Sequence, residues 1–330
     1  MNRPAMTSNK PPGCSCRRAD TEMKTALITG ANGFSGRFLS SKLRGRNYYL
    51  IGLDIDPIRR NDILLDDYVS LDLRNANSVN KVMMEIRPDF VFHLAGIFKA
   101  SENEIYQSNF LAGLNLLDAA VRFSPSARVL IIGSAAEYGH VPAAEMPIRE
   151  SQPCRPINAY GISKHALTMA ARDYYDSRGL RVVIARPFNL IGPGLSESLV
   201  LGAILERVKE ASRKASEPVI KVGRTDTERD FLPVADAVEA YIQLLEGEFW
   251  GEIFNICSGI PRTIRSVIEN LMAFSAQKFR LEEDPSLVRP NDAKISFGSW
   301  EKANAAFGFT PKTDFLKTLE AMWLYAQESE

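Results

Sequence analysis

A glycine-rich turn between a short apolar run and a helical pattern constrains the fold of this chain more than any other feature. Residues 24–29 (KTALIT) predict a buried strand, residues 30–36 (GANGFSG) follow at once, and residues 37–44 place apolar side chains on one face of a helix. Glycines permit a tight turn and a close backbone approach, and the helix that follows points N–H groups at an anion. The arrangement predicts a site for the pyrophosphate of a dinucleotide.

An acidic residue at the end of the second predicted strand strengthens this interpretation. Residues 48–53 (YYLIGL) form that strand, and Asp54 lies 24 residues after Gly30. This is close to the separation of a carboxylate that binds a ribose 2′-hydroxyl. Because a carboxylate repels a 2′-phosphate, we expect NAD(H) rather than NADP(H). Arg59 and Arg60 keep NADP(H) open as the alternative, although solvated surface charge also accounts for them.

Further apolar runs alternate with helical patterns through the first half of the chain. Residues 69–71, 89–96 and 128–133 predict three more strands, and residues 109–123 predict a helix. Continuously apolar strands that alternate with helices indicate a parallel sheet covered on both faces. The expected fold class is therefore α/β, with a Rossmann-type doubly wound parallel sheet.

The regular pattern ends near residue 186 and gives way to loops, shorter strands and helices. We predict a nucleotide-binding domain of residues 23–186 plus 233–258, and a smaller α/β C-terminal substrate-binding lobe of residues 187–232 plus 259–330. Residues 1–22 are polar and proline-rich without an apolar stretch, which predicts a flexible leader and not a signal peptide.

Composition excludes several classes of function. Forty Lys and Arg residues balance 40 Asp and Glu residues, which argues against nucleic acid or an anionic membrane surface as partner. No apolar run approaches the roughly 18 residues that a membrane span needs. We expect no metal, because the cysteines and histidines show no metal-ligand spacing. These residues are Cys14, Cys16, Cys154, Cys257, His93, His140 and His165. We also expect a cytoplasmic protein.

A tyrosine, a lysine and a serine form the candidate catalytic group. Tyr160 and Lys164 are four residues apart, which puts them on one face of a helix. A nearby ammonium favours the phenolate, so we expect Lys164 to lower the pKa of Tyr160 and suit it to proton exchange with a carbonyl or carbinol oxygen. Ser134 follows the fifth strand, at the sheet edge where ligands bind, and could bond the same oxygen.

Seven motifs in order resemble the extended short-chain dehydrogenases/reductases that act on nucleotide-activated sugars. They are TGANGFSG, Asp54, Asp72-Leu73, HLAG at 93–96, GSAAEYG at 133–139, YGISK at 160–164 and RPFNLIGPG at 186–194. Within this family, the stretches RPFNLIGPG, TERDFLPVADAVEAY, FNICSG and DPSLVRPND are most similar to the GDP-4-keto-6-deoxy-mannose reductases.

The resemblance assigns roles to individual residues. It implies Ser134, Tyr160 and Lys164 as the catalytic triad, and Asn189, Arg229 and Arg289 as contacts of the sugar nucleotide, with the arginines on its diphosphate. Arg224 is a further candidate. Besides Tyr160 and Lys164, the implied cofactor contacts are Gly30, Asn32, Gly33, Phe34, Gly36, Asp54, Asp72, Leu73, Leu94, Ala95, Gly96 and Pro187.

The two residues that follow Ser134 distinguish between the reactions that this family carries out. The family's 4,6-dehydratases carry an acid there and its GDP-fucose-forming enzymes carry a cysteine, whereas this chain has Ala135 and Ala136. Alanine cannot exchange a proton, so hydride transfer with a single proton relay remains. Glu137 is displaced by one residue, and on a strand end it should point to the other side.

This reasoning favours NAD(P)H-dependent reduction of the 4-keto group of a nucleotide-activated 6-deoxyhexose, with a GDP-sugar preferred. The alternatives are a 4-epimerase with tightly bound NAD, a 4,6-dehydratase, and a non-catalytic NAD(P)-sensing protein. The resemblance also implies a homodimer through the helices near 109–123 and 158–178. Burial in the monomer's own core is an equally natural role for the apolar residues of these helices, namely Leu114, Leu117, Val121, Leu167 and Ala171.

Overall fold

A computed structural model describes residues 23–213, 218–275, 279–288 and 293–328. Its main element is a seven-stranded sheet in the order β10-β6-β5-β4-β1-β2-β3, in which every neighbouring pair is parallel. The predicted Rossmann-type doubly wound sheet is confirmed. Its strands are β1 (Lys24–Thr29), β2 (Tyr48–Asp54), β3 (Asp67–Ser70), β4 (Phe90–His93), β5 (Arg128–Ile132), β6 (Arg181–Pro187) and β10 (Ile253–Ile256).

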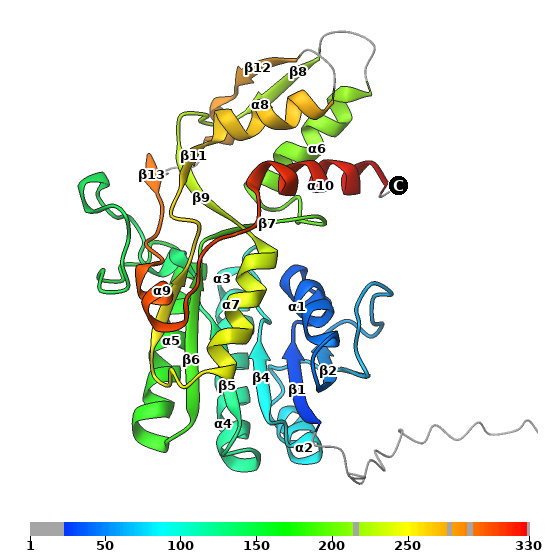
Figure 1. Cartoon of the computed structure of the whole chain (residues 1–330), viewed down its shortest axis with the longest axis vertical. Coiled ribbons are helices and arrows are strands. Elements are labelled where there is room, and N and C mark those ends of the chain that lie inside the picture. Colours follow the sequence, from blue (N-terminus) through cyan, green and yellow to red (C-terminus); the bar gives the residue numbers. More distant parts are fainter. Residues whose placement is uncertain (1–22, 214–217, 276–278, 289–292, 329–330) are drawn as a thin grey trace, which may run out of the picture.

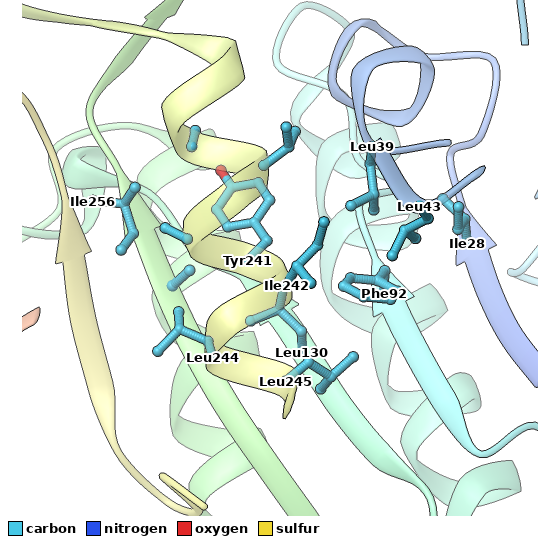
Figure 2. Packing of buried hydrophobic residues seen from close by; sticks show 14 of the residues in the cluster. Ile28, Leu39, Leu43, Phe92, Leu130, Tyr241, Ile242, Leu244, Leu245 and Ile256 are labelled. Atoms are coloured by element: carbon cyan, nitrogen blue, oxygen red, sulfur yellow. The ribbon is translucent and has the colours of Figure 1, made fainter. Parts of the chain in front are cut away.

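Helices cover both faces of this sheet because its central strands are apolar on both sides (Figure 1). On one face, α7 presses Tyr241 and Leu244 toward the strands (Figure 2). On the other face, Leu117, Leu167 and Ala171 are fully buried and belong to the core of the monomer. The covering helices are α1 (Phe34–Arg44) and α7 (Val234–Glu246) on the first face, and α2 (Ala76–Ile86), α4 (Ala112–Phe123) and α5 (Ala159–Arg178) on the second.

A smaller part of the chain lies beyond the carboxyl ends of the large sheet's strands (Figure 1). Its helices pack around a separate core. Its elements are β7 (Asn189–Ile191), α6 (Val200–Ser212), β8 (Val219–Val222), β9 (Glu228–Pro233), β11 (Pro261–Thr263), α8 (Ile264–Phe274), β12 (Arg280–Glu283), β13 (Ile295–Ser296) and α10 (Phe315–Glu328). No helix in the described ranges is both long enough and apolar enough to cross a bilayer.

One segment packs elsewhere than the sequence predicts. The helix α9 (Glu301–Phe307) falls within residues 259–330, which we expected in the substrate lobe. Its Phe307 ring lies 5.5 Å from that of Phe254 in β10, and Ala303 belongs to the same core as α7. The chain therefore returns to the large sheet before α10, because Phe307 and the buried Ala303 of α9 pack against the core at its edge strand.

Candidate active site

The glycine-rich turn closes tightly around the end of β1. Gly30 has a φ of 67°, and a Cβ on it would lie 2.8 Å from the backbone of Ala95. A Cβ on Gly36 would lie 2.5 Å from the carbonyl oxygen of Ala31. The helix α1 begins at Phe34, and its N-cap Gly33 offers its N–H groups no side-chain hydrogen bond. The turn thus has the shape and the open helix N-terminus of an anion cradle.

Asp54 lies directly beside this turn, as predicted. Its carboxylate accepts a hydrogen bond of 2.8 Å from the backbone N–H of Asn32. The Asn32 side chain donates to the carbonyl oxygen of Ile58 at 2.9 Å and accepts from the N–H of Arg60 at 3.2 Å. Asn32 therefore ties the turn to the loop after β2, and fixes where the Asp54 carboxylate sits.

The arginine pair that could favour NADP(H) has other partners. Arg59 donates to the carbonyl oxygen of Leu65 at 3.0 Å. Arg60 forms an ion pair of 3.1 Å with Asp62. Both contacts direct positive charge into the loop itself, so the side chain that the loop presents at the end of β2 is the Asp54 carboxylate.

Asp72 and Leu73 follow β3 at the same sheet edge. The N–H of Leu71 donates to the carbonyl oxygen of Asp54 at 2.7 Å, which places the two strand ends together. Asp72 forms an ion pair of 2.7 Å with Arg74, and this contact holds the pKa of Asp72 below its usual range. Asp72 thus follows the strand end beside Asp54, while the Leu73 side chain is buried in the core on the second face of the sheet.

The loop after β4 is held by a residue that the sequence did not single out. The Asn109 side chain accepts from the N–H of Ile97 at 2.7 Å and donates to its carbonyl oxygen at 2.8 Å. It also donates to Ser163 Oγ at 3.0 Å. Asn109 lies in a π-helical turn, Tyr106–Leu111, a feature frequent at functional sites. A single asparagine inside a helical pattern carries no spacing that could have identified it.

Residues 94–96 reach the same edge through this loop. His93, at the end of β4, pairs through Nδ1 with Thr29 Oγ1 at 2.8 Å, and the N–H of Ala95 donates to that hydroxyl at 3.3 Å. Burial and the Lys164 charge lower the pKa of His93 to about 3. His93 is thus a neutral support for the predicted cofactor segment Leu94–Gly96.

The structure brings Ser134 and Tyr160 together. Ser134 caps the short 3-10 turn Ala135–Glu137, and its Oγ accepts from the N–H of Ala136 at 3.1 Å. Its side chain lies near enough to the Tyr160 hydroxyl to lower the pKa of that phenol. A Cβ on Gly161 would lie 2.6 Å from the carbonyl oxygen of Ala136. A glycine after the tyrosine therefore lets α5 press its first turn against the serine.

Lys164 lies one helical turn further along α5 but faces a different group from the one expected. Its Nζ donates to the carbonyl oxygen of Ile132 at 2.9 Å, and a Cβ on Gly96 would lie 3.1 Å from it. The expectation that Lys164 lowers the pKa of Tyr160 is wrong for this arrangement, because burial raises that pKa and the nearby Ser134 side chain offsets only part of the rise. Burial also lowers the pKa of Lys164 to about 8.

The predicted substrate residues occupy the loops above the sheet. Pro187 is buried at the end of β6. Asn189 is exposed, and its side chain donates to the carbonyl oxygen of Asp230 at 2.8 Å. Arg229 is half-buried in β9, while Arg224 forms an ion pair of 3.1 Å with Asp226. Arg289 lies outside the described residues.

A second arginine stands directly opposite Arg229. Arg262 of β11 is its antiparallel partner in the register, and the Arg262 guanidinium lies 4.0 Å from the ring centre of Phe315. Guanidinium groups on neighbouring strands suit an anionic ligand, so Arg262 joins the candidate contacts for a diphosphate. The sequence motifs missed it, since the pairing of β9 with β11 is tertiary.

Glu137 is the acidic residue that follows Ala135 and Ala136, and its carboxylate is engaged by other groups. The carboxylate of Glu137 is fully buried and bound to the Arg186 guanidinium at 2.7 Å. Side-chain atoms of Glu137, Cys154 and His165 lie within 4.8 Å of one another, close enough for a metal ion. The Glu137 oxygens are already engaged by hydrogen-bond donors, however, so we assign no metal to this group.

Comparison with known proteins agrees with the geometry. The chain matches the NAD dependent epimerase/dehydratase family over residues 26–257. It is 31% identical to GDP-6-deoxy-D-mannose reductase of Pseudomonas aeruginosa, over 90% of this chain and 95% of the relative. It is 27% identical to UDP-glucose 4-epimerase of Azospirillum brasilense, over 88% of both chains.

The comparison with a solved structure supports the same family. RMD from Pseudomonas aeruginosa complexed with NADPH superposes with a TM-score of 0.82 at 29% identity, covering 93% of this chain and 100% of that one. Strand order, glycine-rich turn and matched motifs all agree with one family. The chain belongs to the NAD-dependent epimerase/dehydratase family, and is an NAD(P)-dependent oxidoreductase of the extended short-chain dehydrogenase/reductase type.

Proposed function

We propose that this protein reduces the 4-keto group of a nucleotide-activated 6-deoxyhexose of the GDP-4-keto-6-deoxy-mannose type. The observation that carries the proposal is the Ser134–Tyr160 pair at the carboxyl edge of the sheet, with two alanines where elimination or epimerisation next to the ketone would need an acid or base. The similarity to a GDP-6-deoxy-D-mannose reductase supports a GDP-sugar as substrate.

Tyr160, Ser134 and Lys164 have separate roles in such a reduction. The reduced nicotinamide supplies the hydride when it is bound. Tyr160 gives its proton to O4 of the sugar, and Ser134 donates a hydrogen bond to the same oxygen. Because burial raises the pKa of Tyr160, the phenol keeps its proton near neutral pH and can act as the donor. Lys164, beside Gly96, holds the nicotinamide ribose.

Arginines in the smaller part of the chain would bind the substrate. Arg229 and Arg262 form a cross-strand pair of positive charges, which suits a diphosphate, and Arg289 is proposed as a third contact. Asn189 of β7 donates to the carbonyl oxygen of Asp230, which follows Arg229 in β9. The sugar would then lie between Asn189 and Tyr160.

NAD(H) is the proposed cofactor because of the Asp54 carboxylate. The hydrogen bond from the Asn32 N–H fixes that carboxylate at the end of β2, where a ribose 2′-hydroxyl can bind and a 2′-phosphate is repelled. The similar RMD structure holds NADPH, so NADP(H) is the alternative that a direct comparison of the two cofactors decides.

The proposal is tested by mixing the protein with GDP-4-keto-6-deoxy-mannose and NADH or NADPH under anaerobic conditions. Loss of absorbance at the reduced-nicotinamide band, with one product molecule per cofactor oxidised, is expected. The dTDP-linked analogue serves as a control for base preference. Absence of turnover with both cofactors would refute the proposal.

A 4-epimerase with tightly bound NAD is the second candidate, and the similarity to UDP-glucose 4-epimerase favours it. Such an enzyme retains NAD through purification and interconverts UDP-hexoses without added cofactor. A mass spectrum of nucleotides released from the purified protein separates the candidates. Bound NAD together with UDP-hexose interconversion would replace the reductase assignment.

The proposal also includes a homodimer whose interface is formed by α4 and α5. Exposed apolar side chains on this face include Leu111, which precedes α4, and Ile162 and Met169 of α5, and they are 47%, 42% and 51% accessible. Of the residues expected at first, Leu117, Leu167 and Ala171 are fully buried between the helices and the sheet, whereas Leu114 and Val121 are half-buried. Met169→Glu should shift the mass measured by light scattering toward that of the monomer, while Leu324→Glu on α10 should not.

A further inference from the structure

Glu137 is a charged side chain for which the proposed reaction has no direct use. It lies three residues after Ser134 and is fully buried. One carboxylate oxygen accepts from the Ser134 N–H at 2.9 Å and from Thr168 Oγ1 at 3.1 Å. The other accepts from Arg186 Nε at 2.9 Å and forms the ion pair of 2.7 Å with the same guanidinium.

We propose that Glu137 is a positioning residue that holds the Ser134 hydroxyl in place for the reaction. The inference rests on the proposed role of Ser134 as hydrogen-bond donor to the sugar oxygen. The carboxylate binds the serine's own N–H, so it fixes the backbone from which the hydroxyl extends. Arg186 in turn fixes the carboxylate to β6.

The surrounding structure is built around this carboxylate. A Cβ on Gly133 would lie 2.3 Å from Glu137 Oε1, so a side chain between β5 and Ser134 would displace the carboxylate. Thr168 belongs to α5, the helix that carries Tyr160. A single buried group therefore joins the end of β5, the strand β6 and the helix of the proton donor.

The chemistry of the partners requires an acceptor with no proton of its own. Ser134, Thr168 and Arg186 all donate to Glu137. An ionised carboxylate accepts on both oxygens, whereas an amide presents an NH2 group to one of these donors whichever way it is turned. Glutamine has nearly the same size, so Glu137→Gln removes one set of contacts without leaving a cavity.

Several titratable groups face Glu137. They are Arg186 from β6, Tyr160, Lys164 and His165 from α5, and Cys154 from the loop before α5. The charge of Glu137 raises the pKa of Tyr160 and that of Lys164. Removing the charge should therefore lower the pKa of Tyr160 and move the alkaline fall of kcat to lower pH.

The test compares Glu137→Gln with the wild-type holoenzyme, using the 4-keto sugar nucleotide and reduced cofactor. We expect kcat to fall by about 10- to 100-fold, the cost of a small misplacement of a reacting group. KM and cofactor affinity should stay within about twofold, and the alkaline limb should shift to lower pH. A Leu245→Ala variant loses core packing at the far end of α7, beside Arg128 at the start of β5. It should keep kcat at temperatures below its unfolding transition.

Unchanged kcat and an unchanged pH profile in folded Glu137→Gln would overturn the proposal. If that variant does not fold, Glu137→Asp decides by the same readouts, because it keeps the charge for Arg186 but is one methylene too short to keep both sets of contacts. If the wild type turns over no 4-keto sugar, the proposed function fails on its own. Ultraviolet titration of Tyr160, taken as the difference from Tyr160→Phe, then decides for Glu137: a shift to lower pH in Glu137→Gln supports the role, and no shift overturns it.

Discussion

The ammonium of Lys164 lies 2.9 Å from the carbonyl oxygen of Ile132, at the end of β5. This contact joins the helix that carries Tyr160 to the strand that leads into Ser134. It places a buried positive charge between the proton donor and the loop at Gly96, and burial lowers the pKa of that charge to about 8. The contact with Ile132 fixes the position of the ammonium, and burial sets the direction of its pKa shift.

Stability should depend on pH through Lys164. The unfolded lysine titrates at 10.5 and the folded one at about 8, so the unfolded state binds more protons between these values. Stability from this group is therefore lowest below about pH 8 and recovers toward pH 10.5. Lys164→Met should raise the free energy of unfolding near pH 7 by about 2 kcal/mol, after the lost hydrogen bond is counted. Urea unfolding across this pH range should show that the difference in unfolding free energy between Lys164→Met and the wild type becomes smaller as the pH rises. A constant difference would contradict the lowered pKa of Lys164.

His93 should make the protein sensitive to acid. Its folded pKa is about 3 against an ordinary 6.5, so below about pH 6.5 the unfolded state takes up a proton that the folded state refuses. Stability from this residue is lost as the pH falls from 6.5 toward 3. His93→Asn lacks this titration, and its unfolding free energy should decline less steeply in that range. Equal slopes for both proteins would show that His93 is not neutral in the fold.

Asp54 should determine cofactor preference. Asp54→Asn keeps an oxygen for the Asn32 N–H but removes the charge that repels a 2′-phosphate. We expect the ratio of NADPH to NADH affinity to rise by about 10-fold, corresponding to roughly 1.4 kcal/mol. Fluorescence titration with each reduced cofactor measures the ratio. Asp56→Asn, with its neighbouring and exposed carboxylate, is the matched control for a general change in charge.

The glycine-rich turn should tolerate no side chain at its tightest point. A Cβ on Gly36 would lie 2.5 Å from the Ala31 oxygen, whereas one on Gly45, at the other end of α1, would meet nothing within 4 Å. Gly36→Ala should cost about 1–3 kcal/mol and most of the cofactor affinity. Gly45→Ala should change stability by less than about 0.5 kcal/mol. Thermal melts of both variants with and without NADH measure their stability and their stabilisation by the cofactor. Equal values for the two variants would refute the role of the turn as an anion cradle.

Tyr160→Phe should remove turnover while leaving the cofactor bound. Loss of the proton donor is expected to lower kcat by about 10²- to 10⁴-fold, with the affinity for NADH nearly unchanged. Tyr174→Phe, on the same helix, loses a hydroxyl that bonds Asp118 at 2.7 Å and lies away from Ser134. It should retain full activity, so any fall in its turnover would trace to α5 as a whole and not to the phenol.

Local patterns predict much of this molecule correctly. The strand KTALIT, the turn at Gly30 and the position of Asp54 follow from apolar runs and spacing, because parallel strands must be buried on both faces. Boundaries were less accurate: α1 begins at Phe34, three residues before the predicted start, since the glycine-rich turn already contributes to the first helical turn.

What the sequence by itself determined is the set of groups that can meet at the carboxyl edge of the sheet, because each follows a strand or begins a helix at a readable spacing. The tertiary structure decided how those groups are oriented and charged. It turned Lys164 toward Ile132, buried Glu137 beneath Ser134, and set Arg262 opposite Arg229. These outcomes depend on burial and on contacts between segments far apart in the chain, which no local pattern encodes.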